Sequence, residues 1–67
     1  MRRKEPFPGV GEAEMRTRIQ DARLSDQDAI IAELALIRCM DFAEIAPYAH
    51  CERSTVSRHY KKIIEVV

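Results

Sequence analysis

The apolar residues of this chain follow the 3.6-residue period of an α-helix far better than the two-residue period of a strand. The clearest apolar stripe lies in the middle of the chain and consists of Ile30, Leu34 and Ile37, with Ile31 and Ala35 beside it. This stripe predicts an amphipathic helix over residues 26–39. Because it is the strongest such pattern in the chain, we expect this helix to form the spine of the core.

Two capping patterns indicate where helices begin. Ser25 is followed three residues later by Asp28, and Asp41 is followed at the same spacing by Glu44. A short side chain with an oxygen accepts hydrogen bonds from the free N–H groups of a helix N-terminus, and an acid three residues on can reach back to the cap. The first pattern opens the central helix, and the second predicts another helix after residue 41.

This second helix contains a proline. Its expected inward-facing residues are Phe42, Ile45, Ala46 and Ala49. Inside a helix, Pro47 would remove one backbone donor and clash with the preceding turn, at a cost of about 3 kcal/mol. We therefore expect the helix either to be kinked or to be only one or two turns long.

Two more helices are predicted, one toward each end of the chain. A thin stripe of Met15, Ile19 and Ala22 predicts a helix that begins near Glu12. The last helix is expected from residue 53 or 54 to residue 66, and its apolar side consists of Val56, Tyr60, Ile63 and Val67, with Ile64 beside them. No other long segment has a clear period.

The helix breakers gather at the start of the chain, where they favour a flexible arm over residues 1–11; they are Pro6, Pro8, Gly9 and Gly11. We predict a single all-α domain of three to four helices over residues 12–67. A chain of 67 residues buries only about 60% of the surface that it exposes when unfolded, so a homodimer is one way to gain stability.

Composition excludes several classes of protein. Cys39 and Cys51 are too few for a disulfide framework, and no apolar run approaches the ~18 residues of a membrane span. Arg2, Arg3 and Lys4 resemble the start of a signal peptide, but prolines, glycines and charges follow them instead of an apolar stretch. We therefore expect a cytoplasmic protein with reduced thiols and no membrane partner.

The net charge of zero conceals a segregation of charge along the chain. Residues 24–52 hold one Lys or Arg and six Asp or Glu, a net charge of −5. Residues 53–67 hold four bases and one acid, a net charge of +3, and residues 1–23 carry a net charge of +2. A basic terminal helix suggests an anionic partner, although a charged helix face can also simply be solvated.

Residues 41–66 therefore consist of two predicted helices joined by a short turn, the second with a basic face. This is the arrangement of a helix-turn-helix. The segment from Leu24 to His59 resembles region 4 of sigma-70-type factors and the related short regulators of phages and mobile elements. The resemblance is carried by Phe42, Glu44, Ile45 and Ala46, then by Thr55, Val56, Ser57, Arg58 and His59. It implies a bacterial, phage or mobile-element transcriptional regulator.

The resemblance implies that the last helix enters the major groove of double-stranded DNA. Ser57, Arg58 and Lys61 project outward early enough to reach base edges, and an arginine can hold guanine with two hydrogen bonds. Phosphate contacts are expected from Thr55, Lys62 and Arg53. The full set of expected DNA-binding residues is Arg53, Ser54, Thr55, Ser57, Arg58, Lys61 and Lys62.

The turn departs from the family pattern at three positions. Pro47 replaces a helix former, and His50 stands where the family favours glycine, at a position expected to need a positive φ angle. Glu52 stands where a serine-like cap is expected. Since glutamate caps poorly, we expect Ser54 to cap the last helix and to delay its start.

Other interpretations of these residues stay open. The resemblance also implies that the chain could bind RNA polymerase or another regulator, which would make it a protein-interaction module, and the acidic middle segment could be the surface for a basic partner. Cys39, His50, Cys51 and His59 match no usual zinc-ligand spacing, and no acid or oxyanion motif accompanies a cysteine nucleophile. We expect neither an enzyme nor a cofactor. The three bases at residues 2–4 are either a solvated tail or an arm that reaches a DNA groove.

Overall fold

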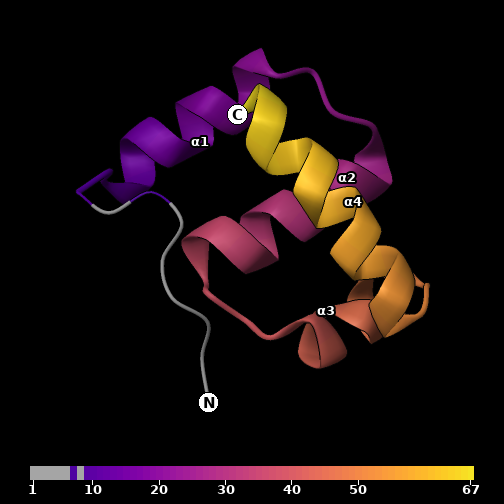
Figure 1. Ribbon diagram of the computed structural model, residues 1–67. Coiled ribbons are helices and arrows are strands. Elements are labelled where there is room, and N and C mark those ends of the chain that lie inside the picture. Colours follow the sequence, from indigo (N-terminus) through magenta and orange to yellow (C-terminus); the bar gives the residue numbers. More distant parts are fainter. Residues whose placement is uncertain (1–6, 8) are drawn as a thin grey trace.

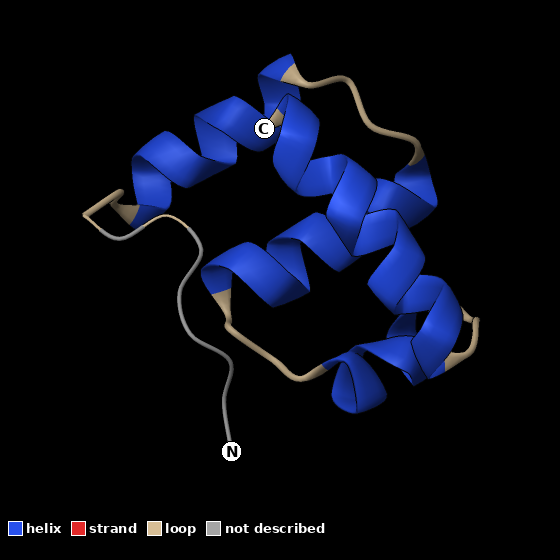
Figure 2. Ribbon diagram, in the orientation of Figure 1, coloured by secondary structure: helices blue, strands red, loops and turns tan. Residues whose placement is uncertain are grey.

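The computed structural model describes Phe7 and residues 9–67. The elements are α1 (Glu12–Asp21), α2 (Asp26–Ala32), the π-helical segment η1 (Glu33–Ile37), α3 (Phe42–Ala49) and α4 (Arg53–Val66). They fold into a small all-helical domain, as Figure 1 and Figure 2 show, with no strand among the described residues. The predicted all-α fold class is confirmed.

The capping patterns lie where the sequence predicts them. Ser25 Oγ accepts a hydrogen bond from the backbone N–H of Asp28 at 3.3 Å, which starts α2 at Asp26. Asp41 and Glu44 form a capping box, in which Glu44 Oε1 accepts from the backbone N–H of Asp41 at 3.1 Å. Both helices therefore begin where local side-chain chemistry satisfies their first N–H groups.

The central helix consists of α2 and η1 in direct succession, and it ends at Ile37 rather than at residue 39. Its last part widens, because the backbone N–H of Arg38 donates to Glu33 O, five residues back, at 3.2 Å. The N–H of Met40 then donates to Leu34 O at 2.9 Å, while Cys39 adopts a left-handed conformation with φ 55°. This closing turn stops the helix before residue 39.

The buried side of this helix differs from the predicted stripe. Ile31, Ala32, Ala35 and Leu36 are buried, whereas Ile30 is 40% exposed and Leu34 and Ile37 are only half-buried. The helix is apolar nearly all round, so its period alone does not decide which side faces inward. Its neighbours decide, since α2 packs against α3 and α4 and η1 against α1. Two alanines on the buried side allow these helices to approach closely.

Helix α3 is short rather than long and kinked. It has eight residues, and Pro47 lies within its final turn, where the missing N–H removes one hydrogen bond at most. His50 follows in the left-handed region, with φ 55° and ψ 42°, as predicted for this turn position. The N–H groups of His50 and Cys51 both donate to Ala46 O, which closes the helix C-terminus.

Three residues, 50–52, join α3 to α4. Glu52 has extended backbone angles, and its carbonyl accepts the first helical hydrogen bond, from Val56 N at 3.0 Å. Helix α4 therefore begins at Arg53, with Glu52 at the cap position but with no hydrogen bond from its side chain. The prediction that Ser54 caps a later-starting helix is wrong, because the turn already aligns the Glu52 carbonyl with the helix axis.

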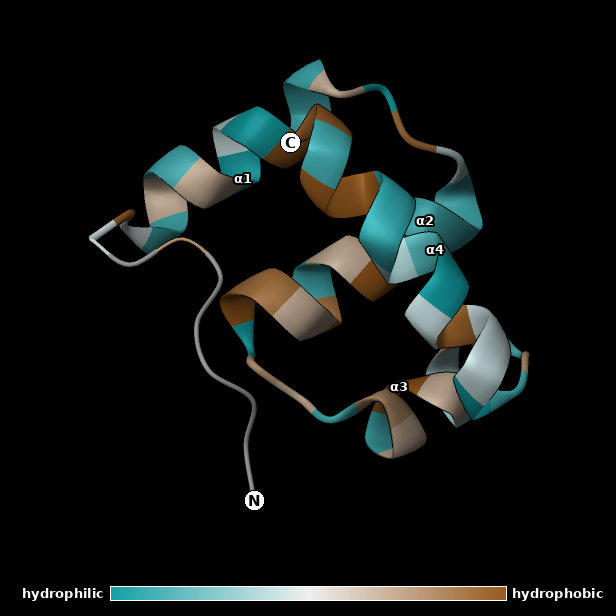
Figure 3. Cartoon of the chain, in the orientation of Figure 1, coloured by the Kyte–Doolittle hydropathy of each residue, from teal (hydrophilic) through white to brown (hydrophobic). Residues whose placement is uncertain are grey.

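The core lies where α2, α3 and α4 meet. Its largest fully buried side chains are Ile31, Ile45, Val56 and Ile63, one or two from each of these helices. In Figure 3 the hydrophobic bands of α4 alternate with hydrophilic ones along the helix, as expected for a helix with one buried side. Gln27 connects α2 to α3, since its amide nitrogen donates to the carbonyl of Ala49 at the end of α3, at 3.0 Å.

Part of the predicted N-terminal arm falls within the described residues. Phe7 and Val10 pack against the core, and the guanidinium of Arg18 lies over the Phe7 ring, 5.9 Å from its centre. Gly9 allows the turn between them, with φ 87°. The three bases at residues 2–4, considered as a DNA-reaching arm, lie outside the described residues.

Candidate nucleic-acid interface

The rotation of α4 about its own axis is fixed by its apolar side. Val56 and Ile63 are 0% and 1% exposed, and Tyr60 is half-buried between them. The ring of Tyr60 packs against that of Phe42 at the start of α3, with 5.1 Å between ring centres and 58° between ring planes. These contacts place α4 against α2 on one flank and α3 on the other, and they leave one side free.

The predicted DNA-binding residues occupy this free side and its two edges. Five of them are exposed: Arg53, Ser54, Arg58, Lys61 and Lys62. Thr55 and Ser57 are half-buried. Arg58 Nη2 donates a long hydrogen bond to Thr55 Oγ1, at 3.4 Å, one turn earlier on the same helix. The residues therefore extend around α4 from the flank that faces α3, with Arg53, Ser54 and Ser57, to the flank that faces α2, with Arg58, Lys61 and Lys62.

The bases of α4 differ from those of α1 in their contacts with acids. Within Phe7 and residues 9–67, no ion pair joins an acid to Arg53, Arg58, Lys61 or Lys62. The arginines of α1 behave differently, because Arg16 pairs with Glu12 and Glu33, and Arg18 pairs with Glu14. The positive charge of α4 is thus available to an external anion.

Two open grooves border the free side of α4. The groove on the α3 flank, about 620 Å³, is lined by Phe42, Glu52, Arg53, Ser54 and Ser57. The groove on the α2 flank, about 530 Å³, is lined by Asp28, Arg58, His59, Lys61 and Lys62. The first groove combines one base with one acid, whereas the second combines three bases and a histidine with one acid. Positive charge is therefore concentrated toward α2.

A contact between α2 and α4 lies in the second groove. His59 Nδ1 and Asp28 Oδ1 are 2.6 Å apart, and the two side chains are 35% and 26% exposed. The sequence pattern predicts no contact of this kind for either residue. Two features of the sequence are consistent with the contact: His59 lies beside the buried stripe of α4, and Asp28 lies in the first turn of α2. Nothing local connects residues 31 positions apart.

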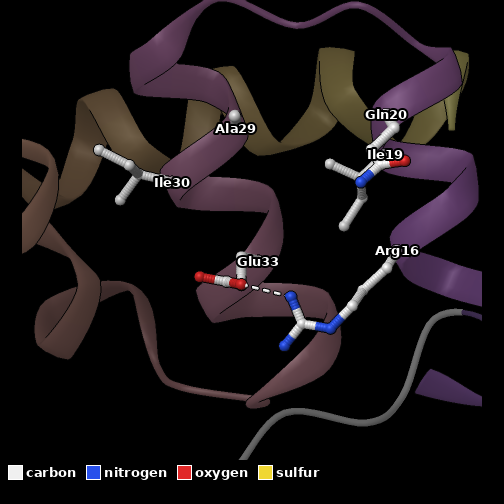
Figure 4. Close-up of a pocket in the computed structure, with 6 residues that line it drawn as sticks. All are labelled: Arg16, Ile19, Gln20, Ala29, Ile30 and Glu33. Atoms are coloured by element: carbon white, nitrogen blue, oxygen red, sulfur yellow. Dashed lines mark hydrogen bonds and ion pairs between the residues drawn. The ribbon is translucent and has the colours of Figure 1, made fainter. Parts of the chain in front are cut away.

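A further groove lies between α1 and the central helix, away from the predicted site (Figure 4). It has a volume of about 270 Å³ and is lined by Arg16, Ile19, Gln20, Ala29, Ile30 and Glu33. Across it, Arg16 Nη1 donates to Glu33 Oε1 at 2.7 Å, and Arg16 also bonds Glu12. These hydrogen bonds to Glu33 and Glu12 raise the pKa of Arg16 above its ordinary value. Both ends of this ion pair are well exposed, which favours a modest structural role.

The described residues gather no set of three or more His, Cys, Asp or Glu side chains that could hold a metal ion. The four residues of the zinc alternative are among those searched. Both cysteines are half-buried free thiols, and Cys51 packs against the core as a small apolar residue. No described helix is both long enough and apolar enough to span a bilayer.

No protein-family model matches the chain, and neither the curated proteins nor the solved structures contain a significant match.

Proposed function

We propose that the chain is a sequence-specific DNA-binding transcriptional regulator in which α3 and α4 act as a helix-turn-helix. In this proposal α4 enters the major groove of double-stranded DNA, and residues early in the helix reach base edges. The observation that carries it is the orientation of α4: its apolar side is buried, and its four bases face solvent without acid partners among the described residues.

The positions of these residues on the two flanks of α4 support separate roles, some in contacts with bases and others in contacts with phosphates. Arg58 and Lys61 are exposed side chains that line the α2-flank groove, and in this proposal they meet base edges, while Ser57 lines the α3-flank groove. Lys62 lines the α2-flank groove and Arg53 the α3-flank groove, so both would face phosphates on either side of the helix. Phosphate contacts would position the helix, and base contacts would provide specificity.

The second candidate is a protein-interaction module that binds RNA polymerase or another regulator. It is favoured by Tyr48, a large side chain that is 61% exposed on α3. The acidic segment supports it less than its charge suggests, because several acids are engaged internally. Asp28 bonds His59, Glu33 bonds Arg16, and Asp41 and Glu44 cap α3. Binding of polymerase in a pull-down, without any binding of DNA at low salt, would favour this candidate.

A homodimer fits the first candidate. A single module of this size offers few contacts to DNA, and dimers of such motifs bind two half-sites about one helical turn apart. Sedimentation of the chain alone and with a duplex carrying one or two half-sites would establish the stoichiometry.

The salt dependence of binding tests the proposal and the role of Lys62 together. Each phosphate neutralised by a base releases counterions, so the logarithm of affinity should fall steeply and linearly with the logarithm of salt concentration. Lys62→Ala should flatten this slope by about 0.9 units, the value expected for one lost phosphate contact. Fluorescence anisotropy with a duplex selected from random DNA provides the measurement.

The control is Arg38→Ala, which removes a positive charge from an exposed position outside α4. It should leave the slope nearly unchanged. An equal change in slope for both variants would mean that net charge alone matters, and an unchanged slope for Lys62→Ala would remove its assignment to a phosphate.

A further inference from the structure

The groove between α2 and α4 contains an ionisable group that the predicted site does not use. His59 lies there among Arg58, Lys61 and Lys62, with Asp28 facing it from α2. Arg23, in the connection between α1 and α2, lines an adjoining groove together with Asp28 and Lys62. The charged groups that line the groove with His59 are therefore one acid and three bases, and Arg23 is a further base in the adjoining groove.

Asp28 engages one nitrogen of the imidazole ring and leaves the other available. The 2.6 Å contact joins Asp28 Oδ1 to Nδ1 of His59. Among the described residues, no hydrogen bond reaches Nε2, and the His59 side chain is 35% exposed. A ring held at Nδ1 by a carboxylate can present Nε2–H to a second anion, and when both nitrogens donate, the ring carries a positive charge.

We propose that this groove holds a backbone phosphate of the bound duplex and that His59 binds it as the imidazolium, so that DNA binding takes up a proton. The inference rests on the proposed function and adds to it a phosphate ligand and a dependence on pH. Lys62 supplies further charge for the same phosphate, and Arg58 and Lys61 line the same groove on the way to the base edges.

The balance of charges in the groove gives the physical reason. In the free protein, the groove that holds His59 is lined by three bases and one acid, Asp28. A phosphate adds negative charge next to the ring and shifts this balance toward the protonated form. A histidine ordinarily changes charge between pH 5 and 8, so the coupling falls in a range where DNA binding is easily measured.

The test is the dissociation constant of a selected duplex at pH 6 and pH 8, at constant ionic strength. The unaltered chain should bind at least about fivefold more tightly at pH 6, the lower end of a typical coupling between two sites. His59→Gln, whose amide can still donate to Asp28, should bind with nearly the same affinity at both pH values. The chain has two histidines, and His50→Asn is the matched control, since asparagine tolerates the left-handed conformation of residue 50.

Asp28→Asn provides a second variant in case the first one unfolds. Because it removes the carboxylate that holds the ring at Nδ1, this variant should show a smaller ratio between the affinities at pH 6 and pH 8 than the unaltered chain. A ratio that Asp28→Asn leaves unchanged would overturn the inference, because the pair would then serve only to hold α4 against α2. A pH dependence that His59→Gln leaves intact would also overturn it while leaving the proposed function standing. Absence of DNA binding at either pH would overturn both.

Discussion

Replacing Arg58 with alanine should weaken binding to a selected DNA site by about five- to 150-fold. This range corresponds to the 1–3 kcal/mol that a two-pronged arginine–guanine contact contributes to discrimination. Arg58 is exposed, and its one hydrogen bond to another described residue, Thr55, is long. The variant should therefore keep its thermal stability, and the loss should be specific to DNA. Anisotropy titrations and a circular dichroism melt measure the two quantities.

Arg58→Lys separates a base contact from a phosphate contact. Lysine keeps the positive charge but lacks the planar fork that matches guanine. If Arg58 contacts a base, Arg58→Lys should lose most of the affinity for the selected site and keep its affinity for unrelated DNA. If Arg58 contacts only phosphate, the lysine variant should bind both nearly as well as the unaltered chain. Arg58→Ala binding as tightly as the unaltered chain would contradict any role for this residue in DNA recognition.

Replacing Ile63 with alanine should destabilise the fold by about 2–5 kcal/mol, the cost of removing most of a buried aliphatic side chain and leaving a cavity. Ile63 is 1% exposed and belongs to the side of α4 that faces the core. A domain of this length has a total stability of roughly 3–10 kcal/mol, so the variant should lose a large share of it and melt at a clearly lower temperature. Chemical denaturation followed by circular dichroism measures the change.

Ile30→Ala is the matched control, since it removes the same atoms from a side chain that is 40% exposed. Its cost should be about 1 kcal/mol or less. Equal losses for the two variants would mean that the central helix faces the core with the stripe predicted from the sequence. Such a result would contradict the observed rotation of that helix.

Local signals account for much of what the sequence could predict. Ser25 with Asp28, and Asp41 with Glu44, mark helix starts through bonds between residues three apart, so the pattern itself contains the interaction. The left-handed conformation of His50 was also predictable, because two helices this close in sequence need a sharp reversal. The apolar side of α4 was identified correctly, since its polar and apolar positions are cleanly separated.

The remaining features depend on contacts between distant segments. The central helix is apolar on more than one side, so the choice of Ile31 over Ile30 as the buried residue rests on where α1, α3 and α4 pack. The pairing of His59 with Asp28 joins two helices and has no local pattern. The expected start of α4 at residue 53 or 54 includes the observed one, Arg53, but the cap was assigned wrongly to Ser54, because the backbone of the turn sets the cap at Glu52.

Helix α4 contributes both to the stability of the fold and to the proposed function. The burial of Val56 and Ile63 determines which side of α4 is left free, and the sequence places its bases on that side and its edges. A substitution that rotates α4 would therefore move Arg58, Lys61 and Lys62 together. For this reason, each DNA-binding variant needs a stability measurement beside its affinity measurement.

The most direct test of the central claim is a map of amide chemical shifts as a selected duplex is added to the isotopically labelled chain. If the free side of α4 binds DNA, the largest changes should fall between Arg53 and Lys62, with smaller ones at the start of α3. Amides of α1 and of the groove near Arg16 and Glu33 should change little. Changes concentrated on α1 and η1, or none at low salt, would contradict the assignment of α4 as the DNA-binding helix.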